Sequence, residues 1–331
     1  MNKIEKNEFV KVLDLIKKSK NKVYQNINTA LIDLYWEIGN YLNQQVANNN
    51  WGKGIILELA KYIKIQEPNI HGFSDKNLWR MKQFYEMYNE NLKLSPLVRE
   101  LTWTNNLLIL SGSKSDEERE FYLNLTIKEK YSKRDLERQI KSGCYERTML
   151  GNKKLSTRVK ELPQNTSNIF KDIYSLEFLP LNDNHSEKNL RIALISKLKN
   201  FILELGRDFC FMGQEYKVQV GKKDFRIDLL FFHRELQCMV AFELKINEFS
   251  PSYLGQLEFY LEALDRDVKK ENENPSIGVL LCRQKDDEVV EYALSRSLSP
   301  AIISQYETKL IPKKILREKL NEFYELLNEN K

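Results

Sequence analysis

The amino-acid sequence predicts an α + α/β chain, in which a helical N-terminal domain precedes a domain of order αβββαβ with a central mixed sheet. Two observations carry this prediction. In the first half, apolar residues recur at helical spacing, as with Leu31, Leu34, Ile38 and Leu42. In the second half, short runs of β-branched and aromatic residues alternate with amphipathic stretches. A length of 331 residues also fits two domains, at roughly 150 residues each.

The composition excludes several classes of protein. Hydrophobic residues make up 42%, and Gly 12 and Pro 8 are low, so neither a disordered nor a collagen-like chain is expected. No apolar run reaches the roughly 18 residues that span a bilayer, and the first residues lack a signal-peptide core. Cysteines and histidines are scattered without metal-ligand spacing, which predicts reduced cytoplasmic thiols and no zinc site. These residues are Cys144, Cys210, Cys238, Cys282, His71, His185 and His233.

The charge is unevenly distributed along the chain. The formal net charge is +5, but residues 1–165 carry +8 and residues 166–331 carry −3. A basic first half suits a polyanionic partner such as nucleic acid. The alternative is a lysine-rich surface that only maintains solubility.

Six helices are expected in the first domain, residues 1–150, each with apolar residues three or four positions apart. Ser74 is an expected N-cap, because its side chain can accept a backbone N–H of the first turn. Ser132 and Asp135 have the spacing of a capping box, with Asp in place of Glu. The helices are expected at 8–46, 51–64, 75–88, 105–111, 116–129 and 133–145.

A polar linker is expected at residues 151–168, where Gly151 and Pro163 interrupt the periodicity. The second domain is expected at residues 169–331. Its first predicted element is SEKNLRIALISKLKNFILELG, which predicts one long amphipathic helix ending at Gly206. Its strands and remaining helices follow in the order of the chain. Strands are expected at 215–220, 225–232, 237–244, 276–282 and 301–306, and helices at 251–268, 286–298 and 312–328.

Two carboxylates and a lysine are the candidates for chemistry. Asp228 interrupts the apolar run FRIDLLFF, and Glu243 and Lys245 lie two residues apart in VAFELK. Residues i and i+2 share one face of a strand, so Glu243 and Lys245 point the same way. Two carboxylates held close in a buried strand pair repel each other, and a divalent cation such as Mg²⁺ relieves that repulsion.

The relative position of the two carboxylates depends on the hairpin that joins their strands. A two-residue loop at Arg234–Glu235 would place Asp228 opposite Ala241. Parity then puts Asp228 and Glu243 on the same face, one diagonal step apart. Alternatively, both carboxylates lie at strand ends and reach solvent, or Lys245 pairs with one of them.

An Asp in one strand followed by Glu-x-Lys in the next resembles the PD-(D/E)xK nuclease superfamily. Glu187, at the start of the preceding helix, and the Q-x-x-x-Y pair Gln256 and Tyr260 in GQLEFY extend the resemblance. The stretch from DFRIDLLFF to FYLEALD is similar to the YhcG-like nuclease family, as are LIDLYWEIG, WGKGIILELA, GFSDKNLWRMKQFYEMY and YERTML. The resemblance covers nearly the whole chain and implies a restriction-endonuclease-like second domain.

Three positions depart from the family pattern. Ile227 stands before Asp228 where the superfamily name has proline. Arg191 stands where a second helix Glu would be expected, and WTNN after Trp103 lacks an expected His.

The resemblance implies a divalent-metal-dependent nuclease, with DNA as the favoured substrate and endonucleolytic cutting. Mg²⁺ or Mn²⁺ would be bound by Asp228, Glu243 and the backbone carbonyl of Leu244. Lys245 would orient or deprotonate the attacking water. Glu187 would hold a water of the ion, or a second ion. As an alternative, Glu187 is a first-turn acid that the helix dipole favours.

The resemblance also implies roles for the Q-x-x-x-Y pair. Gln256 would position Lys245 or the backbone, and Tyr260 would support the site or touch the nucleic-acid strand. The alternative is that Gln256 and Tyr260 are only a packed pair on an amphipathic helix.

The implied partner is nucleic acid, with no membrane and no small organic cofactor. The helical domain would supply DNA binding, specificity or oligomerisation, and a homodimer would suit cutting of both strands. The alternative function is a catalytically inactive nucleic-acid-binding or adaptor protein with a vestigial nuclease domain. The intact set of Asp228, Glu243, Lys245 and Gln256 argues against such decay.

Overall fold

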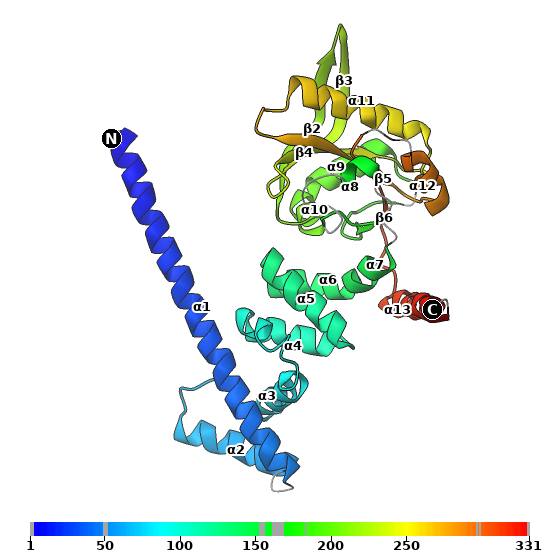
Figure 1. The fold of residues 1–331 in the computed structure, drawn as a ribbon. Helices are drawn as coiled ribbons and strands as arrows, with labels where there is room; N and C mark the ends of the chain where they lie inside the picture. Colours follow the sequence, from blue (N-terminus) through cyan, green and yellow to red (C-terminus); the bar gives the residue numbers. More distant parts are fainter. Residues whose placement is uncertain are drawn as a thin grey trace. The chain divides into compact units, whose positions relative to one another are not determined.

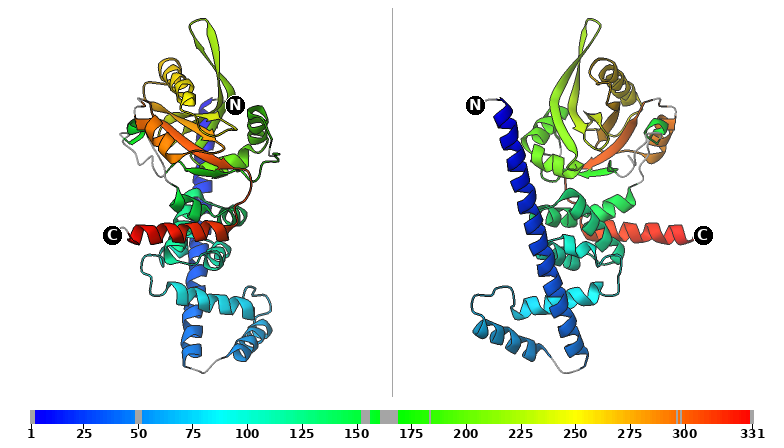
Figure 2. Two further views of the ribbon diagram at one scale, coloured as in Figure 1. Left: turned by 90° about the vertical axis from the view of Figure 1, so that its right-hand side faces the viewer. Right: turned by 60° about the vertical axis from the view of Figure 1, so that its left-hand side comes forward.

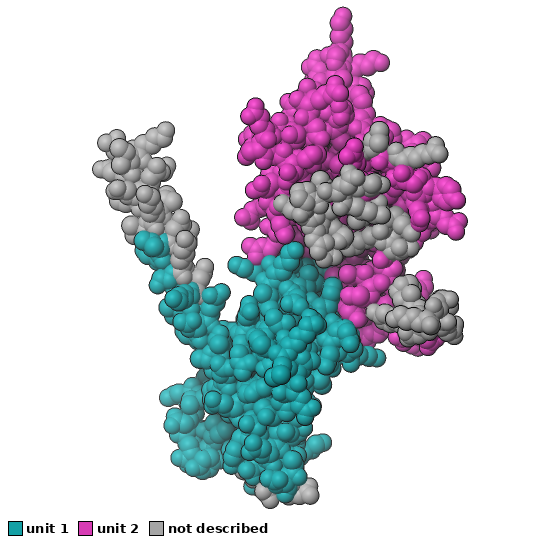
Figure 3. Space-filling view, viewed as in Figure 1, with its two compact units in different colours: residues 1–140 teal, residues 141–331 magenta. Residues whose placement is uncertain are grey.

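The computed structural model of the protein describes residues 3–48, 52–151, 156–160, 169–182, 184–295, 297 and 299–329. The chain divides into two compact units, residues 1–140 and 141–331 (Figure 3). Most of the predicted linker, residues 151–168, lies outside the described residues. In the part of the chain that is described, no helix combines the length and apolarity that crossing a bilayer requires.

The first unit is helical, as predicted (Figure 1). Buried apolar side chains of α1, α2 and α3 form one core cluster. Gly39 lets α1 pass close to α3, because a Cβ there would clash with the backbone carbonyl of Met81. The elements are α1 (Lys3–Ala47), α2 (Lys53–Gln66), α3 (Asp75–Tyr88), η1 (Leu97–Glu100), α4 (Trp103–Gly112), α5 (Asp116–Glu129) and α6 (Lys133–Lys141).

Both predicted helix caps are confirmed. The Ser74 hydroxyl accepts the Asn77 N–H at 3.3 Å. At the start of α6, the Ser132 N–H donates to the Asp135 carboxylate at 3.2 Å and the Asp135 N–H donates to Ser132 Oγ at 3.4 Å. The predicted helix 133–145 is wrong in extent, because Gly143 adopts a left-handed backbone (φ 63°) and separates α6 from the next helix.

The second unit contains a six-stranded sheet with helices around it (Figures 1 and 2). Its helices are α7 (Cys144–Leu150), α8 (Thr157–Lys160), α9 (Glu187–Ser196), α10 (Leu198–Leu205), α11 (Ser252–Asp267), α12 (Asp287–Ser295) and α13 (Lys313–Glu329). Its strands are β1 (Ile173–Ser175), β2 (Phe209–Val220), β3 (Lys223–His233), β4 (Cys238–Leu244), β5 (Asn274–Cys282) and β6 (Ala301–Glu307).

The sheet is mixed, which confirms the predicted fold class. Its strand order is β1-β6-β5-β4-β3-β2. The pairs β1–β6, β6–β5 and β5–β4 are parallel, and the pairs β4–β3 and β3–β2 are antiparallel. One face, which includes Leu229 and Phe242, packs on α9 and α10. The other face, which includes Leu230 and Ala241, packs on α11 and α12. Buried side chains thus alternate between the two layers along β4 and along β3 from Leu229 to Phe232, whereas Ile227 packs in the same cluster as Leu230.

Two parts of the second unit differ from the sequence prediction. Strand β1 is not predicted from the sequence, and β2 begins at Phe209 rather than at residue 215. The single long helix is wrong, because the backbone leaves helical angles at Lys197 (φ −118°, ψ 31°) and divides it into α9 and α10. In the last turn of α9 the Ser196 hydroxyl donates to the Ala193 carbonyl at 2.8 Å, a local bond that competes with helix continuation. The predicted end at Gly206 is confirmed, since its N–H donates to Ile202.

Candidate active site

The two candidate carboxylates lie at the end of the β3–β4 ladder. The last pair of the ladder is Leu229 with Phe242, and the next step of the same register places Asp228 opposite Glu243. The predicted diagonal offset is therefore wrong. A shift of two residues keeps the parity of a strand, so the continued register still predicts a shared face.

The offset was mispredicted because the hairpin loop has four residues, not two. His233 pairs with Cys238, which leaves 234–237 as the loop. The Leu236 N–H donates to His233 Nδ1 at 3.1 Å, and the Leu236 side chain is buried in the core. Gln237 closes the loop with a left-handed backbone (φ 50°). The loop is longer than two residues because the apolar side chain of Leu236 turns into the core.

Where β3 and β4 separate, the side chain of Asp228 accepts a hydrogen bond from the backbone of β4. Its Oδ2 accepts the backbone N–H of Leu244 at 3.0 Å, in place of a carbonyl of the neighbouring strand. Its Oδ1 accepts a hydrogen bond from Arg191 Nη1 at 2.7 Å. The carboxylate of Asp228 is thus fixed by one backbone group and one cation.

Arg191 also binds a carboxylate on the next strand. Its Nη2 lies 3.0 Å from Glu215 Oε1. The β2–β3 register passes from Gln214 with Leu229 to Tyr216 with Ile227, so Glu215 lies opposite Asp228. Glu215 has a left-handed backbone (φ 44°), which interrupts the pairing there.

Glu243 is a buried carboxylate with only half of its hydrogen-bonding capacity used. Its side chain is 4% exposed, and its Oε1 accepts a hydrogen bond from Lys245 Nζ at 2.9 Å. Its Oε2 is buried and has no hydrogen-bond partner among the described residues. Burial, and after it the charge of Asp228, raises the pKa of Glu243 to about 7, although Lys245 acts in the opposite direction.

Lys245 follows β4 directly and joins groups from both helical layers. Its Nζ lies 3.8 Å from Glu187 Oε2, at the first residue of α9, and 5.3 Å from the ring centre of Tyr253 on α11. Burial lowers the pKa of Lys245, but the hydrogen bond and charge of Glu243 outweigh burial and raise it overall. The alternative expected from sequence, an ion pair of Lys245 with one carboxylate, is present in the structure.

The remaining predicted residues lie around this centre. Glu187 is 41% exposed and begins α9, where Ser186 is the N-cap. Gln256 is exposed and donates to Tyr260 Oη at 2.7 Å. Within the described residues, Gln256 therefore hydrogen-bonds Tyr260 and not Lys245. Burial raises the pKa of the Tyr260 hydroxyl, and the charges of Glu243 and Asp228 also raise it.

The donor set fits a hard divalent cation. In the described ranges no three His, Cys, Asp or Glu side chains gather in an arrangement that could hold a metal ion. Two side-chain carboxylates and one backbone carbonyl are available instead, from Asp228, Glu243 and Leu244. The Leu244 N–H points to Asp228, and the carbonyl of an extended residue points to the same side as its N–H. The unpartnered Glu243 Oε2 is an oxygen ligand of the kind that Mg²⁺ takes.

Three residues of this site were not predicted from the sequence. Arg191 departs from the family pattern, but its position four residues after Glu187 places both on one helix face. Tyr253 lies three residues before Gln256 on α11 and has a similar signal. Glu215 carried no such signal, because its role depends on the interruption of β2.

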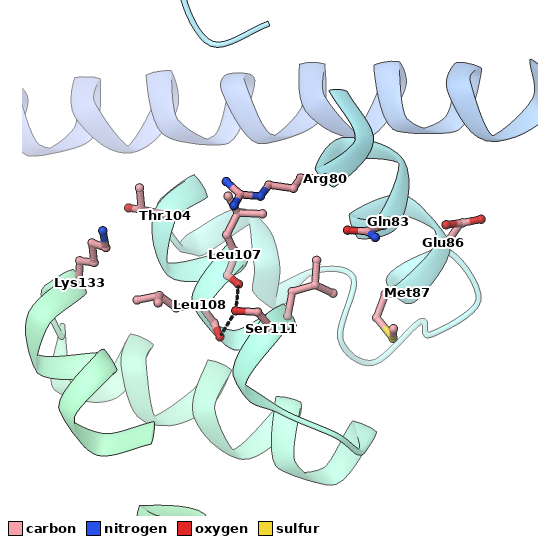
Figure 4. Close-up of a pocket in the computed structure, with 10 residues that line it drawn as sticks. Arg80, Gln83, Glu86, Met87, Thr104, Leu107, Leu108, Ser111 and Lys133 are labelled. Atoms are coloured by element: carbon pink, nitrogen blue, oxygen red, sulfur yellow. Dashed lines mark hydrogen bonds between the residues drawn. The ribbon is translucent and has the colours of Figure 1, made fainter. Parts of the chain in front are cut away.

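A separate cavity of about 580 Å³ lies in the first unit (Figure 4). The Ser111 hydroxyl in its wall donates to the carbonyls of Leu107 and Leu108. Arg80 and Lys133 contribute cationic groups to the lining. None of the predicted site residues lines this cavity.

Both halves of the chain match known protein families. Residues 167–321 match the YhcG PDDEXK nuclease domain, and residues 11–147 match the DUF1016 N-terminal domain. The chain is 30% identical over 345 residues to the protein named "Putative nuclease YhcG" of Escherichia coli (strain K12). That alignment covers 93% of this chain and 92% of the relative.

Two solved structures are similar in part. A repair endonuclease from Pyrococcus abyssi is 16% identical, with a TM-score of 0.26, and EndoMS in apo form is 16% identical, with a TM-score of 0.24. Each alignment covers 39% of this chain and about half of the solved chain, 49% and 48%. The family rests on the sequence matches that span almost the whole chain. The chain belongs to the YhcG family of PDDEXK nucleases.

Proposed function

We propose that this chain is a divalent-metal-dependent endonuclease that hydrolyses phosphodiester bonds in DNA. The observation that carries the proposal is the position of Asp228 opposite Glu243, where β3 and β4 separate. The unpartnered Glu243 Oε2 supports a cation at this point, because a buried carboxylate oxygen without a partner costs free energy.

Asp228, Glu243 and the Leu244 carbonyl would hold Mg²⁺ or Mn²⁺ through oxygen atoms. When bound, the ion supplies positive charge to the phosphate and lowers the pKa of water. Lys245 is fixed by Glu243 and by the ring of Tyr253, so its Nζ would orient the attacking water and offset phosphate charge.

Three residues would act at the edge of this centre. Glu187 is partly exposed and close to Lys245, so it would position a water there. Gln256 is exposed, and its side chain would contact the nucleic-acid strand. Tyr260 is buried, and its hydroxyl accepts the Gln256 amide, so it would fix the orientation of Gln256.

The charge of the chain supports a phosphate-rich partner. Residues 1–140 carry a net charge of +4, and the short segment 141–165 carries another +4. Half of the basic excess of the first 165 residues therefore lies next to the nuclease domain in sequence. Lysine and arginine at this density would bind phosphates without reading base sequence.

The test is cleavage of supercoiled plasmid, linear DNA and RNA with Mg²⁺ or Mn²⁺, with EDTA as the control. The variants are Asp228→Ala and Lys245→Ala. Asp224→Ala is the matched control, since Asp224 is an exposed residue of the same strand in an ion pair with Lys217. We expect the wild type and Asp224→Ala to cut DNA, and the two site variants to lose at least about a hundredfold in rate.

The outcomes separate the proposal from its alternative. If wild type and variants are equally inert but bind DNA with salt-dependent affinity, the chain is an inactive nucleic-acid-binding protein. If RNA is cut and DNA is not, the substrate assignment is wrong and the nuclease assignment stands.

A further inference from the structure

Arg191 lies at the centre of the candidate site although it comes from a different layer. Its guanidinium bridges Asp228, at 2.7 Å, and Glu215, at 3.0 Å, and its side chain is 14% exposed. A planar guanidinium keeps its charge at every physiological pH, so this cation is permanent.

The ionised groups of the site can be counted from their contacts. Arg191 contacts Asp228 and Glu215, and Lys245 contacts Glu243 and Glu187. With all four acids in the ionised form in which carboxylates bind metal ions, four carboxylates and two cations give this connected set a formal charge of −2. One divalent ion neutralises it, and a second would give it a charge of +2.

Arg191 also occupies space that a second ion would need. A second ion on the outer side of Asp228 would bind Oδ1, and this oxygen already accepts from Arg191 Nη1. Glu215, the carboxylate opposite Asp228 on β2, is likewise engaged by Nη2. One guanidinium thus holds both acids on the α9 side of Asp228, which leaves Glu187, beside Lys245, as the remaining acid of the site.

We propose that Arg191 takes the place of a second cation, so that the site binds one divalent ion per chain. This inference rests on the proposed function, because it assumes that Asp228 and Glu243 hold an ion. The fixed guanidinium remains beside Asp228 after the ion binds. Its N–H groups that are not used by the two acids are then available to a phosphate oxygen of the substrate.

The test counts bound Mn²⁺ on the full-length chain without DNA, by calorimetry and by electron paramagnetic resonance of free Mn²⁺. We expect one Mn²⁺ per wild-type chain. Arg191→Gln removes the fixed charge and leaves a formal charge of −3, so a second Mn²⁺ should bind. Arg191→Lys keeps a cation and should retain a stoichiometry of one.

Arg266→Gln is the matched control, because Arg266 is an exposed arginine of α11 that also pairs with a glutamate, Glu262. This variant should bind one Mn²⁺, and circular dichroism should show that all variants are folded. Two Mn²⁺ per wild-type chain, or one Mn²⁺ on folded Arg191→Gln, would overturn the inference and leave the proposed function intact. A wild type that binds no Mn²⁺ would overturn both.

Discussion

Two buried glutamates of the second unit differ in how many hydrogen-bond and ion-pair partners surround their carboxylates. Glu204, on α10, is fully buried, and its Oε1 lies 3.0 Å from Arg147 and 3.1 Å from Lys171, and accepts the Ser175 N–H at 3.0 Å. Glu243 is almost as buried, yet it has one cation on one oxygen and no partner for the other among the described residues. The difference separates a carboxylate that joins elements of the fold from one that retains an unused acceptor oxygen.

The contrast follows from where each side chain lies relative to the sheet. Glu204 faces Ser175, the last residue of β1, and Arg147 of α7, so side-chain and backbone groups surround it on several sides. Glu243 lies where a ladder ends, so the neighbouring strand no longer supplies donors. A buried carboxylate without a full set of donors is unstable as an anion, which raises its pKa and its attraction for a cation.

The largest expected effect concerns Glu204. Glu204→Ala leaves Arg147 and Lys171 without their shared acceptor, so we expect the free energy of unfolding of the second unit to fall by about 3–5 kcal/mol. Urea denaturation followed by circular dichroism measures this loss. The control Glu262→Ala breaks an exposed ion pair with Arg266 and should cost less than about 1 kcal/mol. Equal losses in the two variants would show that the buried ion pairs of Glu204 stabilise the fold no more than an exposed pair does.

The next effect is a pH dependence that belongs to Glu243. Its pKa rises from an ordinary 4.5 to about 7 on folding, so between these values the native state keeps a proton that the unfolded chain has released. The free energy of unfolding in EDTA should therefore fall as pH rises from 4.5 to 7, by at most about 3 kcal/mol from this group. Urea titrations of the wild type and Glu243→Gln, subtracted from each other, isolate this component. A difference that does not change with pH would show that burial leaves the pKa of Glu243 unshifted.

A smaller effect comes from the ion itself. At ten times its dissociation constant, Mg²⁺ should stabilise the wild type by about 1.4 kcal/mol, because it binds the native state. Asp228→Ala lacks one of the proposed ligands and should gain much less at the same concentration. Differential scanning calorimetry with Mg²⁺ and with EDTA gives both values. An equal gain in the two proteins would place the ion elsewhere on the chain.

The smallest effect tests the contact between Tyr253 and Lys245. The ammonium lies 5.3 Å from the ring centre, a contact worth about 0.5–1 kcal/mol at a partly exposed site. Tyr253→Leu should lower the cutting rate a few-fold without loss of the fold. Tyr292→Leu, at an 82% exposed tyrosine of α12, should leave the rate unchanged. If both variants cut like the wild type, the ring does not help to position Lys245.

Much of the fold could be predicted because its signals are local. Ser74, the Ser132–Asp135 capping box and the apolar runs of β3 to β5 each depend on residues close in sequence. The closeness of Asp228 and Glu243 was also predictable, since strand parity survives the extra residues of the hairpin loop.

The missed features depend on contacts between distant residues. The bond between Arg191 and Asp228 joins positions 37 residues apart, and periodicity gives no information about such a pair. The break at Lys197 and the interruption at Glu215 are backbone events that leave the apolar pattern intact. Strand β1 has three residues and depends on β6, which follows it by more than a hundred residues.

The amide of Leu244 gives the site a spectroscopic reporter. Its hydrogen is protected by the Asp228 carboxylate and not by a neighbouring strand, so its exchange with solvent reports on that side chain alone. A ligand that draws Asp228 away would accelerate exchange at this one position, while amides inside the β3–β4 ladder stay protected. Nuclear magnetic resonance of uniformly ¹⁵N-labelled protein would thus follow occupancy of the site without altering any of its side chains.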